Sequence, residues 1–215
     1  MGAFVSDSDR SAGTPGTGPL VVYIGGGTGT GKSTLALALA PRLGLHRVLP
    51  TDAVREILRA FVPAAADPTL HRSSFETGDR TAPSAGPLAG FDSQSRTVLR
   101  GVRAAVQRSV SEGVGMIVEG VHLWPPLVPL DGLPRPARQV VLLLATRDEA
   151  VHRQRFLERG GATGRPAERY LANFAAIRRI HDRLIERAEA HGVPVVDTSP
   201  PEPPVRILEE LVKSR

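Results

Sequence analysis

The sequence predicts an α/β fold in which helices cover both faces of a parallel sheet. Short apolar runs alternate five times with helical patterns along the 215 residues. A glycine-rich loop joins the first apolar run to the first helical pattern. The length suits one domain with a sizeable core, so we expect a disordered tail over residues 1–18 and a single domain over residues 19–215.

The first element is residues 20–34, LVVYIGGGTGTGKST, which read as a strand, a loop and the start of a helix over residues 33–43. They match the phosphate-binding template G-x-x-x-x-G-K-S/T from Gly26 to Ser33. Glycines let backbone N–H groups face one anion, and the helix presents its positive end to the same place. Lys32 would bridge the outer phosphates, and the Ser33 hydroxyl would hold Mg²⁺. The expected nucleotide-binding residues of the loop are Gly27, Thr28, Gly29, Thr30, Gly31, Lys32, Ser33 and Thr34.

A short second strand is expected over residues 46–50, followed by an amphipathic helix that Pro63 closes. Asp52 lies between them, at the carboxyl end of the strand, where open α/β sheets bind ligands. Its carboxylate could accept a proton from a substrate hydroxyl or hold Mg²⁺ through water. The alternative is that Asp52 only caps the helix.

Residues 64–92 lose periodicity and fill with Pro, Gly, Ala and Ser, which is typical of a lid or binding loop. Polar side chains that include His71, Arg72 and Ser73 lie within this segment, although a solvated loop is the alternative. A long helix is expected from Ser93 to Glu112.

The third strand is expected over residues 115–122, and its apolar character predicts a central position in the sheet. A carboxylate at the tip of a buried strand needs a charged partner, so Glu119 is a candidate for the Mg²⁺ shell or the substrate. An arginine partner is the alternative. His122 could equally be a substrate contact or a hydrogen-bonded structural imidazole.

A fourth strand over residues 139–145 leads to an arginine-bearing helix, residues 148–161, which we expect to break at Gly160 and Gly161. If this segment is a hinged lid, spanning about residues 148–166, its arginines would neutralise charge on a transferring phosphoryl group. Arg155 is the candidate nucleotide contact and Arg159 the candidate catalytic arginine, with Arg165 beyond the hinge. A solvated basic helix face is the alternative. A second long helix over residues 166–191, a fifth strand over residues 193–197 and a terminal helix complete the chain.

Composition narrows the class of protein. Basic residues exceed acidic ones by 27 to 22, which favours anionic ligands, but aromatics are only 4% and leave few stacking platforms for nucleic acid. Cysteine is absent, which excludes a disulfide framework and a thiolate metal site. No apolar run approaches the roughly 18 residues that would span a bilayer, so we expect a cytoplasmic protein without a membrane partner.

The ordered set of motifs resembles the P-loop small-molecule kinases, and within them the 2-phosphoglycerate kinase family. The resemblance rests on YIGGGTGTGKSTLA, LPTDAVREILR, PTLHRSSFETG, MIVEGVHL and the segment from ERYLANFAAIRRIHDRLIERA to GVPVVD. It implies a P-loop kinase fold of three layers, α/β/α, with a five-stranded parallel sheet in the order 2-3-1-4-5 and a mobile lid. It also implies that Asp52, Arg55, Arg72 and Glu119 lie on the substrate side, and we add Ser73 and His122 to that set.

The expected activity is a kinase that uses Mg²⁺ and ATP, or GTP, to phosphorylate a hydroxyl of a small metabolite. Lys32, Asp52 and Arg159 would be catalytic, and Ser33 with Glu119 would hold the metal. The acceptor could be 2-phosphoglycerate, a nucleoside, a sugar or an antibiotic intermediate, and a homodimer is one option for the assembly. The alternative classes are a nucleotide-dependent switch ATPase and a kinase or binder of nucleic-acid ends.

Overall fold

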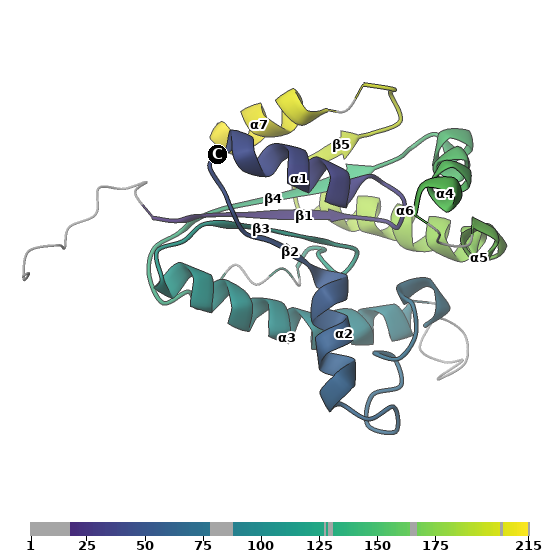
Figure 1. The fold of residues 1–215 in the computed structure, drawn as a ribbon, viewed down its shortest axis with the longest axis horizontal. Coiled ribbons are helices and arrows are strands. Elements are labelled where there is room, and N and C mark those ends of the chain that lie inside the picture. The colour runs from purple at the N-terminus through teal and green to yellow at the C-terminus, as the bar shows by residue number, and fades with distance from the viewer. Residues whose placement is uncertain are drawn as a thin grey trace, which may run out of the picture.

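A five-stranded parallel sheet in the order β2-β3-β1-β4-β5 forms the centre of the computed structural model (Figure 1). The structure describes residues 18–77, 88–126, 128, 131–163, 167–202 and 204–214, without the side chains of residues 159–163. The predicted parallel sheet and its strand order are confirmed, whereas the predicted tail lies almost entirely outside the described residues. The strands are β1 Leu20–Gly26, β2 Val48–Pro50, β3 Met116–Gly120, β4 Arg138–Ala145 and β5 Val195–Asp197.

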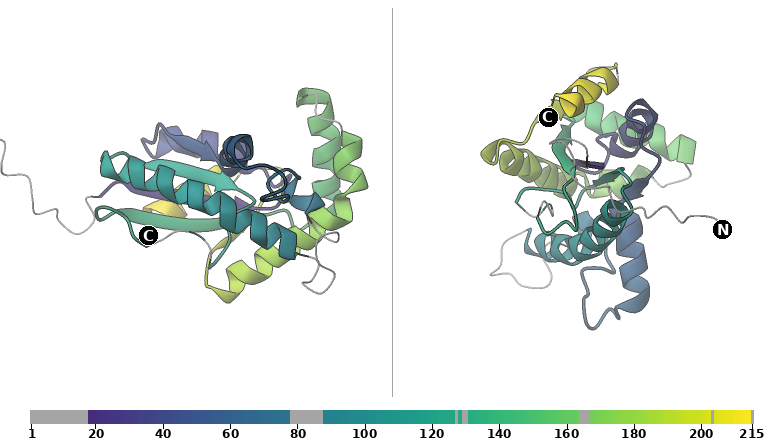
Figure 2. Two further views of the ribbon diagram at one scale, coloured as in Figure 1. Left: turned by 90° about the horizontal axis from the view of Figure 1, so that it is seen from below. Right: turned by 90° about the vertical axis from the view of Figure 1, so that its left-hand side faces the viewer.

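Helices cover both faces of this sheet, as Figures 1 and 2 show. One face packs against α1 (Lys32–Arg42) and α7 (Val205–Lys213), and the opposite face packs against α3 (Ala89–Ser111) and α6 (Phe174–Ala190). Strand β1 serves both faces because successive side chains alternate: Val22 and Ile24 join the core under α1, while Val21 and Tyr23 join the core under α3.

The parallel register brings the carboxyl ends of the strands to one edge of the sheet. Gly25 pairs with Gly120, and Pro50 pairs with Glu119. Helix α2 (Thr51–Phe61) therefore begins beside the end of β3, while α4 (Glu149–Thr163) and α5 (Ala167–Ala172) stand at the same end of the molecule (Figure 1). This edge collects the glycine loop, Asp52 and Glu119, as the sequence predicts.

Three expected boundaries are wrong. Helix α4 does not break at Gly160 and Gly161 but runs to Thr163. The expected long helix over residues 166–191 is two helices, because the turn at Asn173 separates α5 from α6. Helix α3 begins at Ala89, four residues before the predicted start. Part of the expected irregular segment is ordered as a 3-10 turn, η1 (Ser74–Glu76), whereas residues 78–87 lie outside the described chain.

None of the helices in the described ranges has the length and apolar character that crossing a membrane requires.

Candidate active site

The glycine loop closes a tight turn between β1 and α1. Gly29 and Gly31 have φ of +87° and +83°, in the left-handed region that other residues seldom adopt. The Thr30 hydroxyl donates to the Gly27 carbonyl at 2.9 Å, and the Lys32 ammonium donates to the same carbonyl at 2.7 Å. Lys32 is thus held in the loop at the start of α1.

Helix α4 supports this loop from outside. A Cβ atom added at Gly29 would lie 2.7 Å from the Phe156 ring, and His152 Nε2 donates to the Thr28 carbonyl at 2.7 Å. Burial lowers the pKa of His152 to about 4, which keeps the imidazole neutral at pH 7. By contrast, a Cβ added at Gly31 would meet nothing within 4 Å. The loop is packed tightly at Gly29 and open at Gly31, as a cradle for phosphate groups requires.

A cavity of about 510 Å³ opens on one side of the loop. Residues Gly29 to Leu35 line it together with Arg155, Glu158, Thr198 and three prolines from the segment before α7. The Arg155 guanidinium is fixed here, because it donates to the Thr146 and Thr198 hydroxyls at 2.9 Å each. Arg155 therefore lines the same cavity as the glycine loop, and its contact with a nucleotide stays a prediction.

A second cavity of about 520 Å³ lies on the other side of the loop, toward α2. It shares Gly29, Lys32 and Ser33 with the first cavity. Its remaining wall comes from the start of α2, from η1, from the end of β3 and from α5; the lining residues include Asp52, Arg55, Glu56, Ser73, Ser74, Phe75, Glu119, Arg169 and Tyr170. The two cavities therefore meet at the end of the loop that carries Lys32.

Ser33 and Glu119 form the candidate metal site. The Ser33 hydroxyl donates to Glu119 Oε1 at 2.9 Å, and Glu119 is only 4% exposed at the end of β3. No cluster of three or more acidic, histidine or cysteine side chains suited to a metal occurs within the described ranges. A hydroxyl and a carboxylate suit Mg²⁺, which retains waters and takes its remaining ligands from substrate phosphates. The donor set fits a metal that arrives with the nucleotide.

Asp52 and Arg55 lie together on the first turn of α2. Asp52 Oδ1 is 3.7 Å from Arg55 Nε, and the Asp52 side chain is 74% exposed toward the second cavity. The Arg55 guanidinium is largely buried and also contacts Glu56, Leu70 O and Arg72 O. Asp52 has no side-chain capping contact among the described hydrogen bonds of α2, so the capping alternative gains no support.

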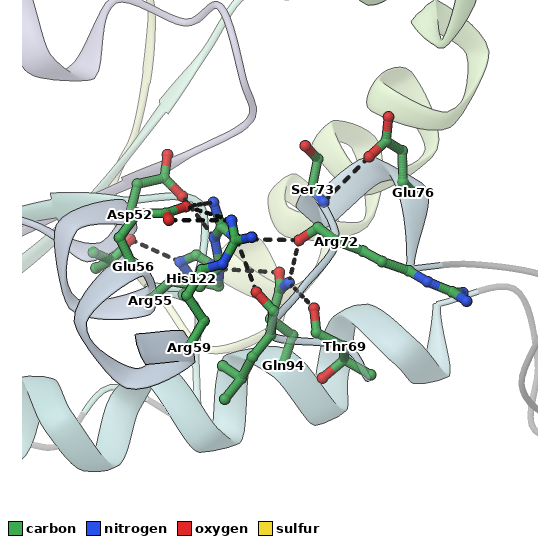
Figure 3. Close-up of polar contacts among 12 residues, drawn as sticks. Asp52, Arg55, Glu56, Arg59, Thr69, Arg72, Ser73, Glu76, Gln94 and His122 are labelled. Atoms are coloured by element: carbon green, nitrogen blue, oxygen red, sulfur yellow. Dashed lines mark hydrogen bonds and ion pairs between the residues drawn. The ribbon is translucent and has the colours of Figure 1, made fainter. Parts of the chain in front are cut away.

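The structure separates Arg72 from Ser73. The Arg72 side chain points away from Asp52 (Figure 3) and lines a different cavity, of about 650 Å³, between η1 and α6. Ser73 remains at the second cavity, where its hydroxyl accepts from Arg169 at 2.7 Å. Arg169, which the sequence analysis missed, also forms an ion pair with Glu76 at 2.8 Å. Only the backbone carbonyl of Arg72 faces the Asp52 region, so its guanidinium does not join this site in the structure.

His122 also differs from the expectation. It is fully buried, and its two ring nitrogens contact Thr51 and Gln94 at 2.8 and 3.1 Å. Both nitrogens are therefore occupied within the protein, which matches the structural-imidazole alternative and leaves neither nitrogen for a direct substrate contact. Gln94 and Thr51 carry no sequence signal of this role, because they approach His122 only through the tertiary fold.

The arginines of the expected lid are only partly described. Arg159 lies in the last turns of α4, where the structure does not describe its side chain, and Arg165 lies outside the described residues. The Arg153 guanidinium stacks on the Phe174 ring, 4.2 Å from the ring centroid, so this side chain packs against the first residue of α6. The catalytic role of Arg159 and the closure of a lid remain predictions.

The sequence is similar to those of curated 2-phosphoglycerate kinases. A curated 2-phosphoglycerate kinase from Methanopyrus kandleri is 43% identical over 184 residues, which cover 83% of this chain and 56% of that protein. The 2-phosphoglycerate kinase from Methanocaldococcus jannaschii is 38% identical over 184 residues, covering 85% and 59%. The chain therefore spans less than two thirds of the length of these relatives. No protein-family profile matches the chain.

The fold has a counterpart among solved structures. A protein from Chloroflexus aurantiacus with 19% sequence identity superposes with a TM-score of 0.51 and covers 93% of this chain and 96% of its own. At this identity the likeness concerns the fold alone. The expected resemblance is thus confirmed: the chain is similar in sequence to 2-phosphoglycerate kinases, and it has the three-layer P-loop fold with the strand order that the motifs imply.

Proposed function

We propose that this chain is a small-molecule kinase that transfers the γ-phosphoryl group of ATP to a hydroxyl of 2-phosphoglycerate. The observation that carries the proposal is the pair of cavities that meet at Gly29, Lys32 and Ser33. A nucleotide in one cavity would place its γ-phosphoryl group at the loop. An acceptor in the other cavity would approach the same group from the opposite side, as in-line transfer requires.

The chemistry follows from the residues at this junction. The acceptor hydroxyl oxygen would form a bond to the γ-phosphorus while the bond between that phosphorus and the β,γ-bridging oxygen breaks, and the hydroxyl proton would pass to the exposed Asp52 carboxylate. Lys32 would stabilise the negative charge on the transferring group, and Arg155 would hold the nucleotide side. Mg²⁺, bound through Ser33 and Glu119, would neutralise the phosphate charge.

The charges of the second cavity bear on the acceptor. Lys32, Arg55 and Arg169 supply three positive charges, and Asp52, Glu56 and Glu119 supply three negative ones. Arg55 is 13% exposed and is engaged by two neighbouring carboxylates, whereas Arg169 is 51% exposed and pairs with one carboxylate, that of Glu76. We infer that Arg169 receives the anionic group of the acceptor, so that the hydroxyl lies toward Asp52.

ADP release tests the proposal directly. The protein should release ADP from Mg-ATP when 2-phosphoglycerate is added, and less when glycerate, a nucleoside or a sugar replaces it. Lys32→Ala should abolish the acceptor-dependent rate while the protein stays folded by circular dichroism. Steady hydrolysis that no acceptor stimulates would instead favour a switch ATPase, and stimulation by nucleic-acid ends with a steep salt dependence would favour the nucleic-acid alternative.

The same assay decides the nucleotide and the acceptor. A higher kcat/KM with GTP than with ATP would correct the donor. Equal rates with Arg169→Ala and with wild type at low 2-phosphoglycerate concentration would contradict the assignment of the acceptor anion to Arg169.

A further inference from the structure

Three buried polar side chains, Thr51, His122 and Gln94, form a hydrogen-bonded row, and Figure 3 shows His122 and Gln94 beside Arg55. All three are 0% exposed. The Thr51 hydroxyl lies 2.8 Å from His122 Nδ1, His122 Nε2 lies 3.1 Å from Gln94 Oε1, and Gln94 Nε2 donates to the carbonyls of Thr69 and Arg72 at 2.5 and 2.9 Å. Polar groups buried without water depend on one another for partners, so this row behaves as one unit.

The direction of each hydrogen bond in the row is determined. The two backbone carbonyls can only accept, so the Gln94 amide nitrogen must face them and the Gln94 amide oxygen must face the imidazole. His122 Nε2 therefore carries the proton and donates, and His122 Nδ1 accepts from the Thr51 hydroxyl. Burial lowers the pKa of His122 to about 4, with Arg55 and Lys32 adding to the effect against Asp52, so the imidazole stays neutral at pH 7.

Both ends of the row reach the residues of the acceptor side. Thr51 is the first residue of α2 and precedes Asp52 directly. At the other end, the Arg72 carbonyl that Gln94 holds also accepts from Arg55 at 3.4 Å, and Arg55 donates to Leu70 O at 2.9 Å. The row thus connects the start of α2 with the loop that fixes the Arg55 guanidinium.

Close packing against β3 fixes the Thr51 end. A Cβ atom added at Gly120 would lie 1.7 Å from Thr51 Oγ1, so the hydroxyl occupies the space that only glycine leaves beside Glu119. Gly120 also follows the candidate metal ligand in the same strand. The Thr51 side chain therefore has one orientation, which directs its hydroxyl to His122.

We propose that Thr51, His122 and Gln94 are positioning residues that hold Asp52 and Arg55 in fixed relation at the acceptor cavity, without contacting either substrate. This role rests on the proposed function and adds to it the residues that orient the acceptor-binding side chains. The row touches the acceptor side alone; the nucleotide cavity has its own support in Arg155, Thr146 and Thr198.

Paired substitutions at Thr51 test the inference. Thr51→Val keeps the shape and removes the hydroxyl, which leaves His122 Nδ1 buried without a donor, whereas Thr51→Ser keeps the hydroxyl. With 2-phosphoglycerate as the acceptor, Thr51→Val should lower kcat/KM for the acceptor by roughly tenfold to a hundredfold, the effect of one orphaned buried acceptor, and leave KM for ATP within about twofold. Thr51→Ser should keep most of the wild-type kcat/KM for the acceptor.

A matched pair on α3 separates positioning from general destabilisation. Gln94→Leu should reduce acceptor kcat/KM, while Gln107→Leu removes an exposed bond from the same helix to the Gly132 carbonyl and should leave both substrates unaffected. If Gln94→Leu does not fold, the Thr51 pair still decides. Equal kinetics for Thr51→Val and wild type, or an equal loss for ATP and acceptor, would overturn the proposal.

A spectroscopic readout distinguishes failure of this inference from failure of the proposed function. Nitrogen NMR of the His122 ring, assigned by its loss in His122→Asn, should show a protonated Nε2 and an unprotonated Nδ1 at pH 7 and at about pH 5.5. Thr51→Val should shift the Nδ1 resonance. A protonated Nδ1 at pH 7 would overturn the row itself. An unchanged row in a protein that phosphorylates no acceptor would overturn the proposed function, and the positioning role with it.

Discussion

Asp52→Asn separates chemistry from stability at the second cavity. The carboxylate is 74% exposed and 3.7 Å from Arg55 Nε, and ion pairs of this kind contribute about 0–1 kcal/mol. Its place in the first turn of α2 adds roughly 0.3–1 kcal/mol through the helix dipole. The free energy of unfolding should therefore fall by about 2 kcal/mol or less. Loss of a general base, by contrast, should lower kcat by about 10²–10⁴.

The assay pairs steady-state ADP release in the presence of 2-phosphoglycerate with urea unfolding of the same preparation. KM for ATP should change little, because Asp52 lines only the second of the two cavities around the loop. Asp131→Asn is the matched control: that carboxylate is 85% exposed, pairs with Arg103 at 2.8 Å and lines neither cavity. An unchanged kcat in Asp52→Asn would refute the role of Asp52 as the base, and so would an equal loss in the control.

Three further predictions concern the loop, the metal and pH. Gly31→Ala and Gly44→Ala both place a side chain at positive φ, +83° and +65°, with nothing within 4 Å, so each should lower the free energy of unfolding by about 1 kcal/mol. Only Gly31→Ala should also raise KM for ATP, and equal KM values would contradict the phosphate cradle. Glu119→Gln keeps an acceptor for Ser33 but removes the charge, so the Mg²⁺ concentration for half-maximal rate should rise several-fold; an unchanged Mg²⁺ titration would remove Glu119 from the metal site. The pKa of His122 is lowered from 6.5 to about 4 in the folded protein, so the unfolded state binds more protons as pH falls below 6.5, and stability present above that pH is lost toward pH 4. When the pH is lowered from 7 to 5, the free energy of unfolding measured in urea should fall by about 2 kcal/mol less in a folded His122→Gln variant than in wild type. An equal fall in the two proteins would contradict a neutral buried imidazole.

The sheet and the loop were predictable because their signals are local. The apolar runs of β1 and β3 place successive side chains in two cores, and the glycine spacing before Lys32 has few uses other than phosphate binding. Parallel pairing then places Asp52 and Glu119 at one edge without further information. This part of the site follows from pattern and topology together.

The helix boundaries at the same end depended on tertiary contacts. Gly160 and Gly161 were expected to end α4, but a glycine costs a helix only about 1 kcal/mol, which packing can offset. Helix α3 begins within a segment of poor helix formers, and its second residue, Gly90, lies so close to the Thr77 backbone that an added Cβ atom would be 2.1 Å from the carbonyl oxygen. Such contacts join residues that no sequence window compares.

The second cavity shows the same limit. Arg72 and Ser73 are neighbours in the sequence, yet only Ser73 lines the second cavity. Arg169 reaches that cavity from α5, through its bonds to Ser73 and Glu76. Its distance from those residues along the chain left no spacing signal to detect.

In the proposed function, one chain holds a phosphoryl donor and a hydroxyl acceptor on two sides of the Lys32 loop. Phosphorus NMR of a reaction that contains the protein, Mg-ATP and 2-phosphoglycerate tests this most directly. We expect the γ-phosphate signal of ATP to decrease while a second phosphate ester resonance appears on the acceptor, and we expect neither change with Lys32→Ala. Inorganic phosphate as the sole new product, or a new ester formed equally by Lys32→Ala, would contradict the claim.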